Sequence, residues 1–183
     1  MTRRLSRAAW LRHGLLTLAG EGHNGLTVGA MAQRLGVSRG SFYWHFRDIA
    51  DFRTQLLAAW QDATTDQVIR DLDARTAGPD GQAGGGLKVL LQRTMRPGRS
   101  LERAVRAWAG EDPEAAAAIA GVDARRLARV EALLADAGVP VERTAPRAAF
   151  LYWAYLGQSV VMDARHNTIA ADALDDIAEL FES

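Results

Sequence analysis

Cysteine is absent from the 183-residue chain, and proline is scarce, with only five residues. The lack of cysteine excludes disulfides, thiolate metal sites and cysteine nucleophiles. No apolar run approaches the roughly 18 residues of a membrane span. No stretch alternates apolar and polar side chains as a half-buried strand would. Hydrophobic residues make up 48% and charged residues 24%, as in an average globular protein, so disorder of the whole chain is excluded.

Signatures of catalysis and metal binding are also missing. In the glycine-rich segment 81–88, Leu87 rather than glycine precedes Lys88, so the segment does not fit a phosphate-binding loop. The four histidines lie far apart, and none forms a His-x3-His pair. A Gly-x-Ser-x-Gly nucleophile elbow does not occur. The sequence therefore predicts that the protein is not an enzyme and uses neither a cofactor nor a metal.

Net charge is absent, but the charges are unevenly distributed. The 22 basic residues balance the 22 acidic ones. Residues 1–47 hold seven arginines and one acidic residue, a formal charge of +6, and residues 48–183 carry −6. A basic N-terminal region suggests contact with a polyanion, although charge alone leaves chance clustering equally open. Arg3 and Arg4 could begin an export signal, but Arg12 and His13 interrupt the following apolar run, so we expect a helix and a cytoplasmic protein.

Apolar residues recur at helical spacing along the chain, which predicts an all-α fold. Ala8, Leu11, Leu15 and Leu18 form the expected buried stripe of the first helix, and Ile49, Phe52, Leu56, Ala59 and Ala63 that of the fourth. Thr27, Ser38 and Asp48 are the expected N-caps of the second, third and fourth helices. The predicted helices cover about 5–19, 28–35, 39–45, 48–75, 87–95, 101–110, 113–120, 122–137, 144–164 and 170–181.

The segment 28–45 predicts a helix-turn-helix. Gly36 can adopt the positive φ of the turn, and Ala32 is small where the two helices cross. Met31, Leu35, Val37 and Phe42 are expected to fill the angle between the helices. On the second helix Phe42 and Phe46 point inward, which leaves an outward face that suits DNA: Arg39, Gly40, Ser41, Tyr43 and Trp44.

Residues 27–47, with the Gly36-Val37-Ser38 turn and the Tyr43-Trp44-His45-Phe46 end, resemble the DNA-binding signature of the TetR family of transcriptional regulators. The resemblance implies that Arg39, Gly40 and Ser41 read base edges. It implies that phosphates are gripped by Thr27, Tyr43, His45 and Arg47, with Arg3 and Arg4 as a possible basic arm. Three alternatives stay open: Thr27 as a cap only, His45 as a structural histidine bonded to the backbone, and Arg47 as a solvated charge.

By the same resemblance, residues 1–47 are the DNA-binding domain and residues 48–183 form a helical effector-binding and dimerisation domain. Segment 150–156 is apolar on every side of a helix, so one side can meet the core and the other a second subunit. The last helix adds the stripe Ile169, Ala173, Ile177 and Leu180. A small amphipathic or apolar effector is expected, with the pocket candidates Met95, Trp108, Tyr152, Trp153 and Tyr155.

The resulting hypothesis is a ligand-responsive regulator of transcription. It is expected to be a repressor that binds a palindromic operator in double-stranded DNA as a homodimer, without contact to a membrane. The alternative is a helical small-molecule-binding or protein-interaction module that does not read DNA specifically.

Overall fold

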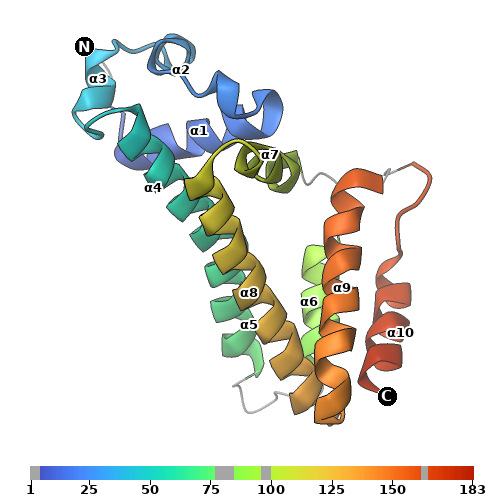
Figure 1. The fold of residues 1–183 in the computed structure, drawn as a ribbon. Helices are drawn as coiled ribbons and strands as arrows, with labels where there is room; N and C mark the ends of the chain where they lie inside the picture. Colours follow the sequence, from blue (N-terminus) through green and yellow to red (C-terminus); the bar gives the residue numbers. More distant parts are fainter. Residues whose placement is uncertain (1–4, 77–84, 96–99, 162–164) are drawn as a thin grey trace. The chain divides into compact units, whose positions relative to one another are not determined.

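The computed structural model describes residues 5–76, 85–95, 100–161 and 165–183, and this part of the chain contains helices and no strands (Figure 1). The predicted arm, Arg3 and Arg4, lies outside the described residues. Among the described helices, none combines the length and the hydropathy needed to cross a bilayer. The helices are α1 (Arg7–Glu21), α2 (Val28–Leu35), α3 (Gly40–Tyr43), α4 (Ile49–Gln61), α5 (Gln67–Thr76), α6 (Gly86–Thr94), α7 (Ser100–Ala109), α8 (Pro113–Asp136), α9 (Val141–Val161) and α10 (Ala171–Glu182).

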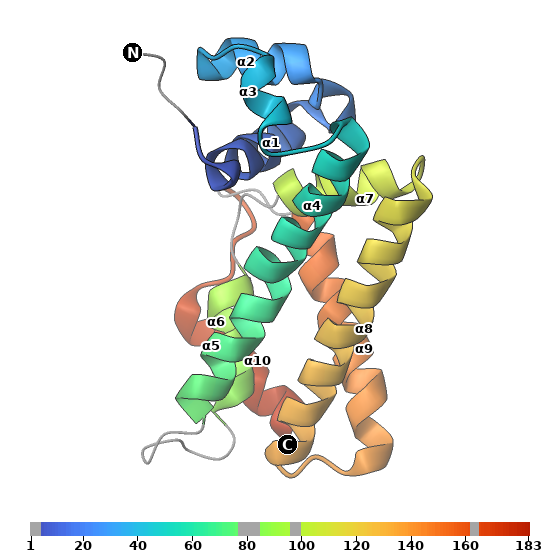
Figure 2. The same ribbon diagram turned by 90° about the vertical axis from the view of Figure 1, so that its left-hand side faces the viewer.

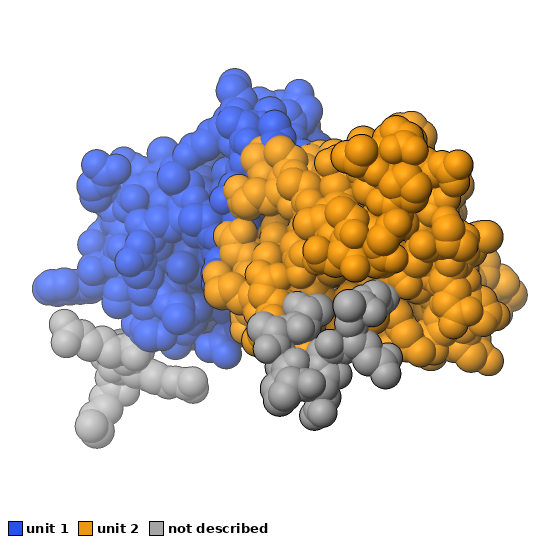
Figure 3. All heavy atoms as spheres, turned by 90° about the horizontal axis from the view of Figure 1, so that it is seen from below, with its two compact units in different colours: residues 1–63, 100–120 blue, residues 64–99, 121–183 orange. Residues whose placement is uncertain are grey.

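The chain packs as two compact units, shown in different colours in Figure 3. Unit 1 comprises residues 1–63 and 100–120, and unit 2 comprises residues 64–99 and 121–183. The first turns of α8 therefore belong to unit 1 and the remainder to unit 2. This division describes packing. The functional boundary expected between residues 47 and 48 is a different division and stays a prediction.

Unit 1 is built around α1, which lies against both α4 and α7. Its buried face consists of Trp10, Gly14, Thr17 and Leu18. The expected stripe was therefore wrong at Ala8, which is exposed, and at Leu11 and Leu15, which are only half-buried. The helix is turned so that the large Trp10 ring is enclosed and Gly14 faces α4. On α4 the buried residues are Phe52, Leu56, Leu57 and Trp60, so the expected stripe was wrong at Ala63, which is exposed, and at Ile49 and Ala59, which are only half-buried.

Unit 2 is a helical bundle whose core joins four helices (Figures 1 and 2). Leu87 and Leu91 of α6 pack with Val130 and Leu134 of α8. The same cluster includes residues from α9 and α10, among them Ala148, Leu151, Leu174 and Ala178. In Figure 2 α6 and α10 lie side by side, in agreement with their extensive contacts.

Several helix boundaries differ from the sequence prediction: α3 (Gly40–Tyr43) is shorter than the predicted 39–45, and two other helices differ in their continuity. A single helix, α8, replaces the two expected at 113–120 and 122–137, because the alanine-rich run before Gly121 favours helix by more than one glycine costs. The expected long helix 48–75 is α4 and α5 joined by a π-helical turn, Asp62–Asp66. A π turn inserts one extra residue into a helix and is frequent at functional sites.

Candidate functional sites

The first candidate site is the predicted helix-turn-helix, and its first helix is fixed at both ends. The backbone N–H of Ala30 donates to Oγ1 of Thr27 at 3.3 Å, which confirms Thr27 as the N-cap of α2. Gly36 ends α2 in the left-handed conformation with φ 65°, as predicted. The N–H of Val37 then bonds to the carbonyl of Ala32 at 3.0 Å. These contacts set the angle at which the chain enters α3.

Helix α3 has only one turn and is held in place by aromatic rings. Phe42 is fully buried, and its ring centroid lies 5.4 Å from that of Trp10 on α1 and 5.5 Å from that of Phe52 on α4. Phe46 is 2% exposed and packs edge-on to Phe52 with centroids 4.9 Å apart. The inward direction predicted for Phe42 and Phe46 is thus confirmed. Because edge-to-face pairs add to burial, this short helix is fixed without a side-chain cap.

The outer side of α3 presents polar and aromatic groups to solvent. Trp44 is 76% and Tyr43 58% exposed. Gly40 is exposed as well, and Ser41 is half-buried. Ser38 was expected to cap this helix, but the N-cap residue is Arg39 and no side chain bonds to the first turn.

Arg39 is exposed and its guanidinium folds back over α2. A Cβ atom at Gly29 would lie 2.9 Å from Nη2 of Arg39, so the absence of a side chain at Gly29 makes room for the guanidinium. Sequence reasoning missed Gly29, because nothing in the local pattern shows which side chain lies above a glycine. The long Arg39 side chain can leave this position by rotating its own torsions.

Two other predicted phosphate ligands have partners within the protein. Nε2 of His45 lies 2.8 Å from the carbonyl oxygen of Leu5, the structural contact that the sequence left open. The backbone N–H of Arg47 donates to Oδ2 of Asp51 at 2.9 Å, while its side chain is 85% exposed. That backbone hydrogen bond and a side-chain hydrogen bond from Gln55 hold the pKa of Asp51 below its usual range. The Arg47 guanidinium, 3.9 Å from Oδ1 of Asp51, remains accessible between α3 and α4.

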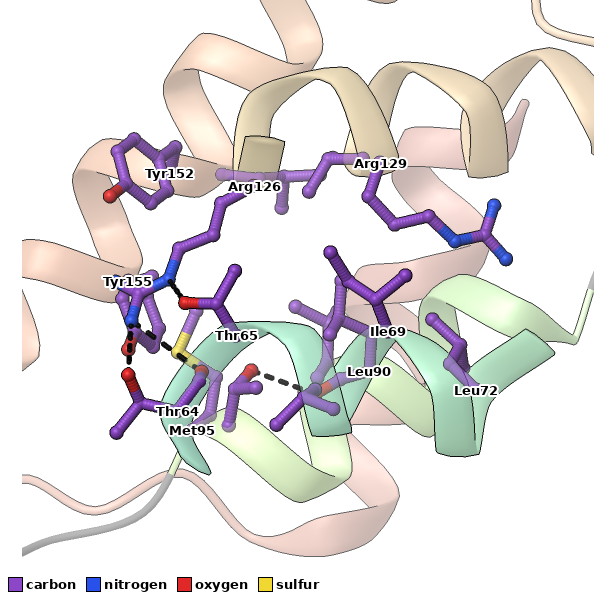
Figure 4. Close-up of a pocket in the computed structure, with 15 residues that line it drawn as sticks. Thr64, Thr65, Ile69, Leu72, Leu90, Met95, Arg126, Arg129, Tyr152 and Tyr155 are labelled. Atoms are coloured by element: carbon purple, nitrogen blue, oxygen red, sulfur yellow. Dashed lines mark hydrogen bonds between the residues drawn. The ribbon is translucent and has the colours of Figure 1, made fainter. Parts of the chain in front are cut away.

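The second candidate site is a cavity inside unit 2, drawn in Figure 4. The cavity is partly open to solvent. Its walls come from the π turn, α5, α6, α8 and α9, and most of the side chains are apolar. A mostly apolar lining with polar groups at one end suits a small amphipathic molecule.

Three of the five pocket candidates line this cavity: Met95, Tyr152 and Tyr155. Trp108 does not, because it lies in unit 1, where it is 1% exposed, stacks on His23 and donates to Asp112 Oδ2 at 3.1 Å. Trp153 does not line it either, since its position on α9 leaves it 67% exposed. Residue type alone predicted both tryptophans as pocket residues, but the rotation of each helix decides where such a ring points.

The polar end of the cavity is formed by residues that the sequence did not single out. Arg126 donates from Nε to Oγ1 of Thr65 at 2.9 Å and from Nη2 to Oγ1 of Thr64 at 3.1 Å. Beside them, the hydroxyl of Tyr152 donates to Oδ1 of Asp123 at 2.5 Å. Burial, followed by this hydrogen bond, raises the pKa of Tyr152, so the hydroxyl is protonated at neutral pH. Arg126 on α8 is far from the π turn in sequence, so no sequence pattern indicated its contacts with Thr64 and Thr65.

In the part of the chain that the structure describes, no group of three or more histidine, aspartate and glutamate side chains is placed to hold a metal ion.

Comparison with known proteins identifies the family of the domain that carries the first candidate site. The family model for bacterial regulatory proteins of the TetR family matches residues 15–56, which include the whole helix-turn-helix. No curated protein matches the chain.

Solved structures resemble the chain over nearly its full length. A protein from Mesorhizobium loti assigned to the TetR-family regulators has 17% identity and a TM-score of 0.70, with 97% of this chain and 96% of that chain covered. A second, from Rhodococcus sp., has 18% identity and a TM-score of 0.69, covering 97% and 98%. A third, from Clostridium perfringens and assigned to regulation of fatty acid metabolism, has 15% identity and a TM-score of 0.69, covering 94% and 95%.

At these identities the structural matches establish the fold, and the family model establishes the origin of the N-terminal domain. Residues 15–56 therefore form a helix-turn-helix DNA-binding domain of the TetR family, and the chain as a whole has the fold of TetR-family regulators of transcription.

Proposed function

We propose that the protein is a transcriptional repressor that binds a palindromic operator as a homodimer and leaves it when a small amphipathic effector fills the cavity. The observation that carries the proposal is the exposed face of α3, which is fixed by the buried ring cluster around Phe42. An α-helix held in this way can enter the major groove and direct Arg39 and Ser41 toward base edges. Thr27, Tyr43 and Arg47 are the proposed phosphate contacts, and His45, whose Nε2 contacts the Leu5 carbonyl, is proposed to reach a phosphate only through its other ring nitrogen. Gly40 allows close approach and Trp44 flanks the contact.

The proposed dimer rests on one face of α9. Phe150, Trp153, Val160 and Val161 follow each other at helical spacing and are all more than half exposed. Between them, Gly157 has open space where a side chain would stand, so a partner backbone could come close. Leu180 of α10 is 69% exposed as well. A contiguous apolar patch of this kind marks an interaction surface, and two-fold symmetry makes it pair with itself.

The proposed effector rests on the cavity of unit 2. The assignment of the Clostridium perfringens neighbour to fatty acid metabolism agrees with an apolar cavity that has one polar end. An effector that lowers DNA affinity must itself be bound more weakly in the presence of DNA, by the same factor.

The decisive experiment is selection of bound sequences from random DNA duplexes, followed by titration of the selected site. If Arg39 makes a bidentate base contact, Arg39→Ala should weaken binding to this site by about 1–3 kcal/mol while leaving binding to unrelated DNA nearly unchanged. Arg12→Ala removes the same charge from an exposed position of α1 and serves as the control.

Three results would contradict parts of the proposal. Equal losses on selected and unrelated DNA would make Arg39 a phosphate contact only. Selection of a non-repeated site would argue against the palindrome. No salt-dependent binding to any duplex would favour the alternative, a helical small-molecule-binding or protein-interaction module.

A further inference from the structure

Arg126, at the polar end of the cavity, is hydrogen-bonded to several groups of the protein itself. It donates from Nε to Oγ1 of Thr65 at 2.9 Å and from Nη2 to Oγ1 of Thr64 at 3.1 Å (Figure 4). The guanidinium also donates to the hydroxyl of Tyr152. Its central carbon lies 5.2 Å from the centre of the Tyr155 ring. The fold therefore holds this arginine from several sides.

The charge of Arg126 is balanced by Asp123, which lies one turn before it on α8. The hydroxyl of Tyr152 donates to Oδ1 of Asp123 at 2.5 Å and accepts from Arg126, so one hydroxyl joins the two charged groups. The pKa of Tyr152 is raised by burial and by the hydrogen bond to Asp123, whereas Arg126 acts in the opposite direction. The polar end of the cavity thus contains one positive and one negative group that are connected to each other.

Arg129, the other arginine of the lining, is balanced in the same way. Its Nη2 lies 2.7 Å from Oδ1 of Asp73, and its Nη1 lies 4.0 Å from Oδ2 of Asp136. Its Nε is buried and has no acceptor among the described residues, so a neutral oxygen atom could accept this N–H. An anionic group would instead be repelled by the two carboxylates that already face the guanidinium.

We propose that the effector is an uncharged amphipathic molecule. The inference rests on the proposed function in assuming that the cavity is the effector site. The two arginines are balanced by carboxylates, and the other residues given for the lining are uncharged. A charged head group would lose its hydration on entry without meeting an opposite charge that lacks a partner, whereas a hydroxyl or carbonyl group loses far less. The apolar part can lie along Ile69, Leu72 and Leu90 (Figure 4).

The test compares three probes with the same ten-carbon chain, 1-decanol, decanoate and decylammonium, by calorimetric titration of the full chain at neutral pH. Wild-type protein should bind 1-decanol at least about tenfold more tightly than either ion, because only the ions must give up a charged hydration shell. Two ions of opposite sign are needed, since an unbalanced arginine would favour the anion and an unbalanced aspartate the cation.

Asp123→Asn removes the negative group of the polar end and keeps an acceptor for the Tyr152 hydroxyl. The affinity for decanoate should then rise at least about tenfold relative to that for 1-decanol, while decylammonium stays weak. Asp66→Asn is the matched control, because Oδ1 of Asp66 accepts from Nε of Arg125 at 3.1 Å outside the cavity lining. This variant loses the same charge and should keep the wild-type order of the three probes.

The inference would be overturned if wild-type protein bound either ion as tightly as 1-decanol, or bound none of the three probes. Neither result depends on the folding of a variant. An unchanged order of probes in folded Asp123→Asn, checked by circular dichroism, would contradict the balance of charges on which the inference depends.

Titrations repeated on protein bound to its selected duplex separate the two proposals. A preference for 1-decanol that the duplex leaves unchanged in affinity would support the uncharged site and contradict release from DNA by the effector. Binding of a palindromic duplex without a preference for 1-decanol would support the repressor and contradict the uncharged effector.

Discussion

Gly14 occupies the middle of α1, where glycine costs a helix about 1 kcal/mol relative to alanine. Its position explains why the chain accepts this cost. A Cβ atom at residue 14 would lie 2.6 Å from Cζ of Phe52 and 2.9 Å from Cδ1 of Leu56. Both side chains are fully buried, so they have no open space into which they could move. The glycine lets α4 approach α1, and α4 carries part of the ring cluster that fixes α3.

Gly14→Ala should therefore lower the free energy of unfolding, although alanine favours helix. We expect a net loss of about 1–2 kcal/mol, because overpacking of a filled core exceeds the gain in helix propensity. Gly20→Ala is the matched control in the same helix, since a Cβ atom at Gly20 would meet nothing within 4 Å. It should stabilise the protein by up to about 1 kcal/mol in urea unfolding. Equal effects of the two substitutions would show that Gly14 is not required for packing.

At the scale of elements, the start of α8 is held by a single carboxylate. Oδ1 of Asp112 accepts from the backbone N–H groups of Glu114 and Ala115 at 2.9 and 3.1 Å, and its Oδ2 accepts from the indole of Trp108. The hydrogen bond from Ala115 is the largest cause that lowers the pKa of Asp112 below its usual range. The cap thus joins α8 to the buried Trp108 of α7.

Asp112→Ala should lower the free energy of unfolding by about 0.5–2 kcal/mol at neutral pH, as loss of an N-cap usually does. The pKa of Asp112 is lower in the folded than in the unfolded chain, so ionisation stabilises the fold above the ordinary aspartate pKa. This contribution is lost as the pH falls through the lowered folded value. Asp112→Asn keeps an acceptor without a charge and serves as the control. Urea unfolding between neutral and acid pH should show wild-type stability falling relative to Asp112→Asn, and parallel curves would contradict the assignment.

Elements were predictable from sequence where a local rule fixes them. Thr27 as a cap and Gly36 as a stop gave the bounds of α2, and Asp48 accepts from the N–H of Asp51 as expected of the cap of α4. Contacts that depend on packing were not predictable. The Gly29 space for Arg39 depends on the angle between α2 and α3, and the Arg126 bonds join α8 to a π turn that is remote in sequence, so no local pattern contains either contact.

We propose that the whole molecule is a dimer. A substitution on the proposed interface should therefore change the association of the subunits, which would not be expected of a monomeric protein. Trp153 is 67% exposed on α9, with the exposed Phe150 one turn before it. Exposure of two neighbouring large apolar rings to water is unusual for a monomeric protein. If this face is self-complementary, Trp153→Glu places two like charges in one apolar interface. Because an uncompensated buried charge costs roughly 3 kcal/mol or more, the dissociation constant of the dimer should rise by at least about a hundredfold. Sedimentation equilibrium measures this directly.

Leu16→Glu is the control for that substitution, because Leu16 is equally exposed, at 67%, but lies on α1 in unit 1. It should leave the dimer intact.

Loss of the dimer should also change DNA binding in a defined way. A palindromic site is bound by two recognition helices about 34–36 Å apart, so a monomer contacts a single half-site and loses the energy of the second. Trp153→Glu should therefore bind a full operator only as tightly as an isolated half-site, whereas Leu16→Glu should keep the wild-type preference for the full site. If Trp153→Glu forms dimers of wild-type affinity, the subunits associate through a surface other than this face of α9.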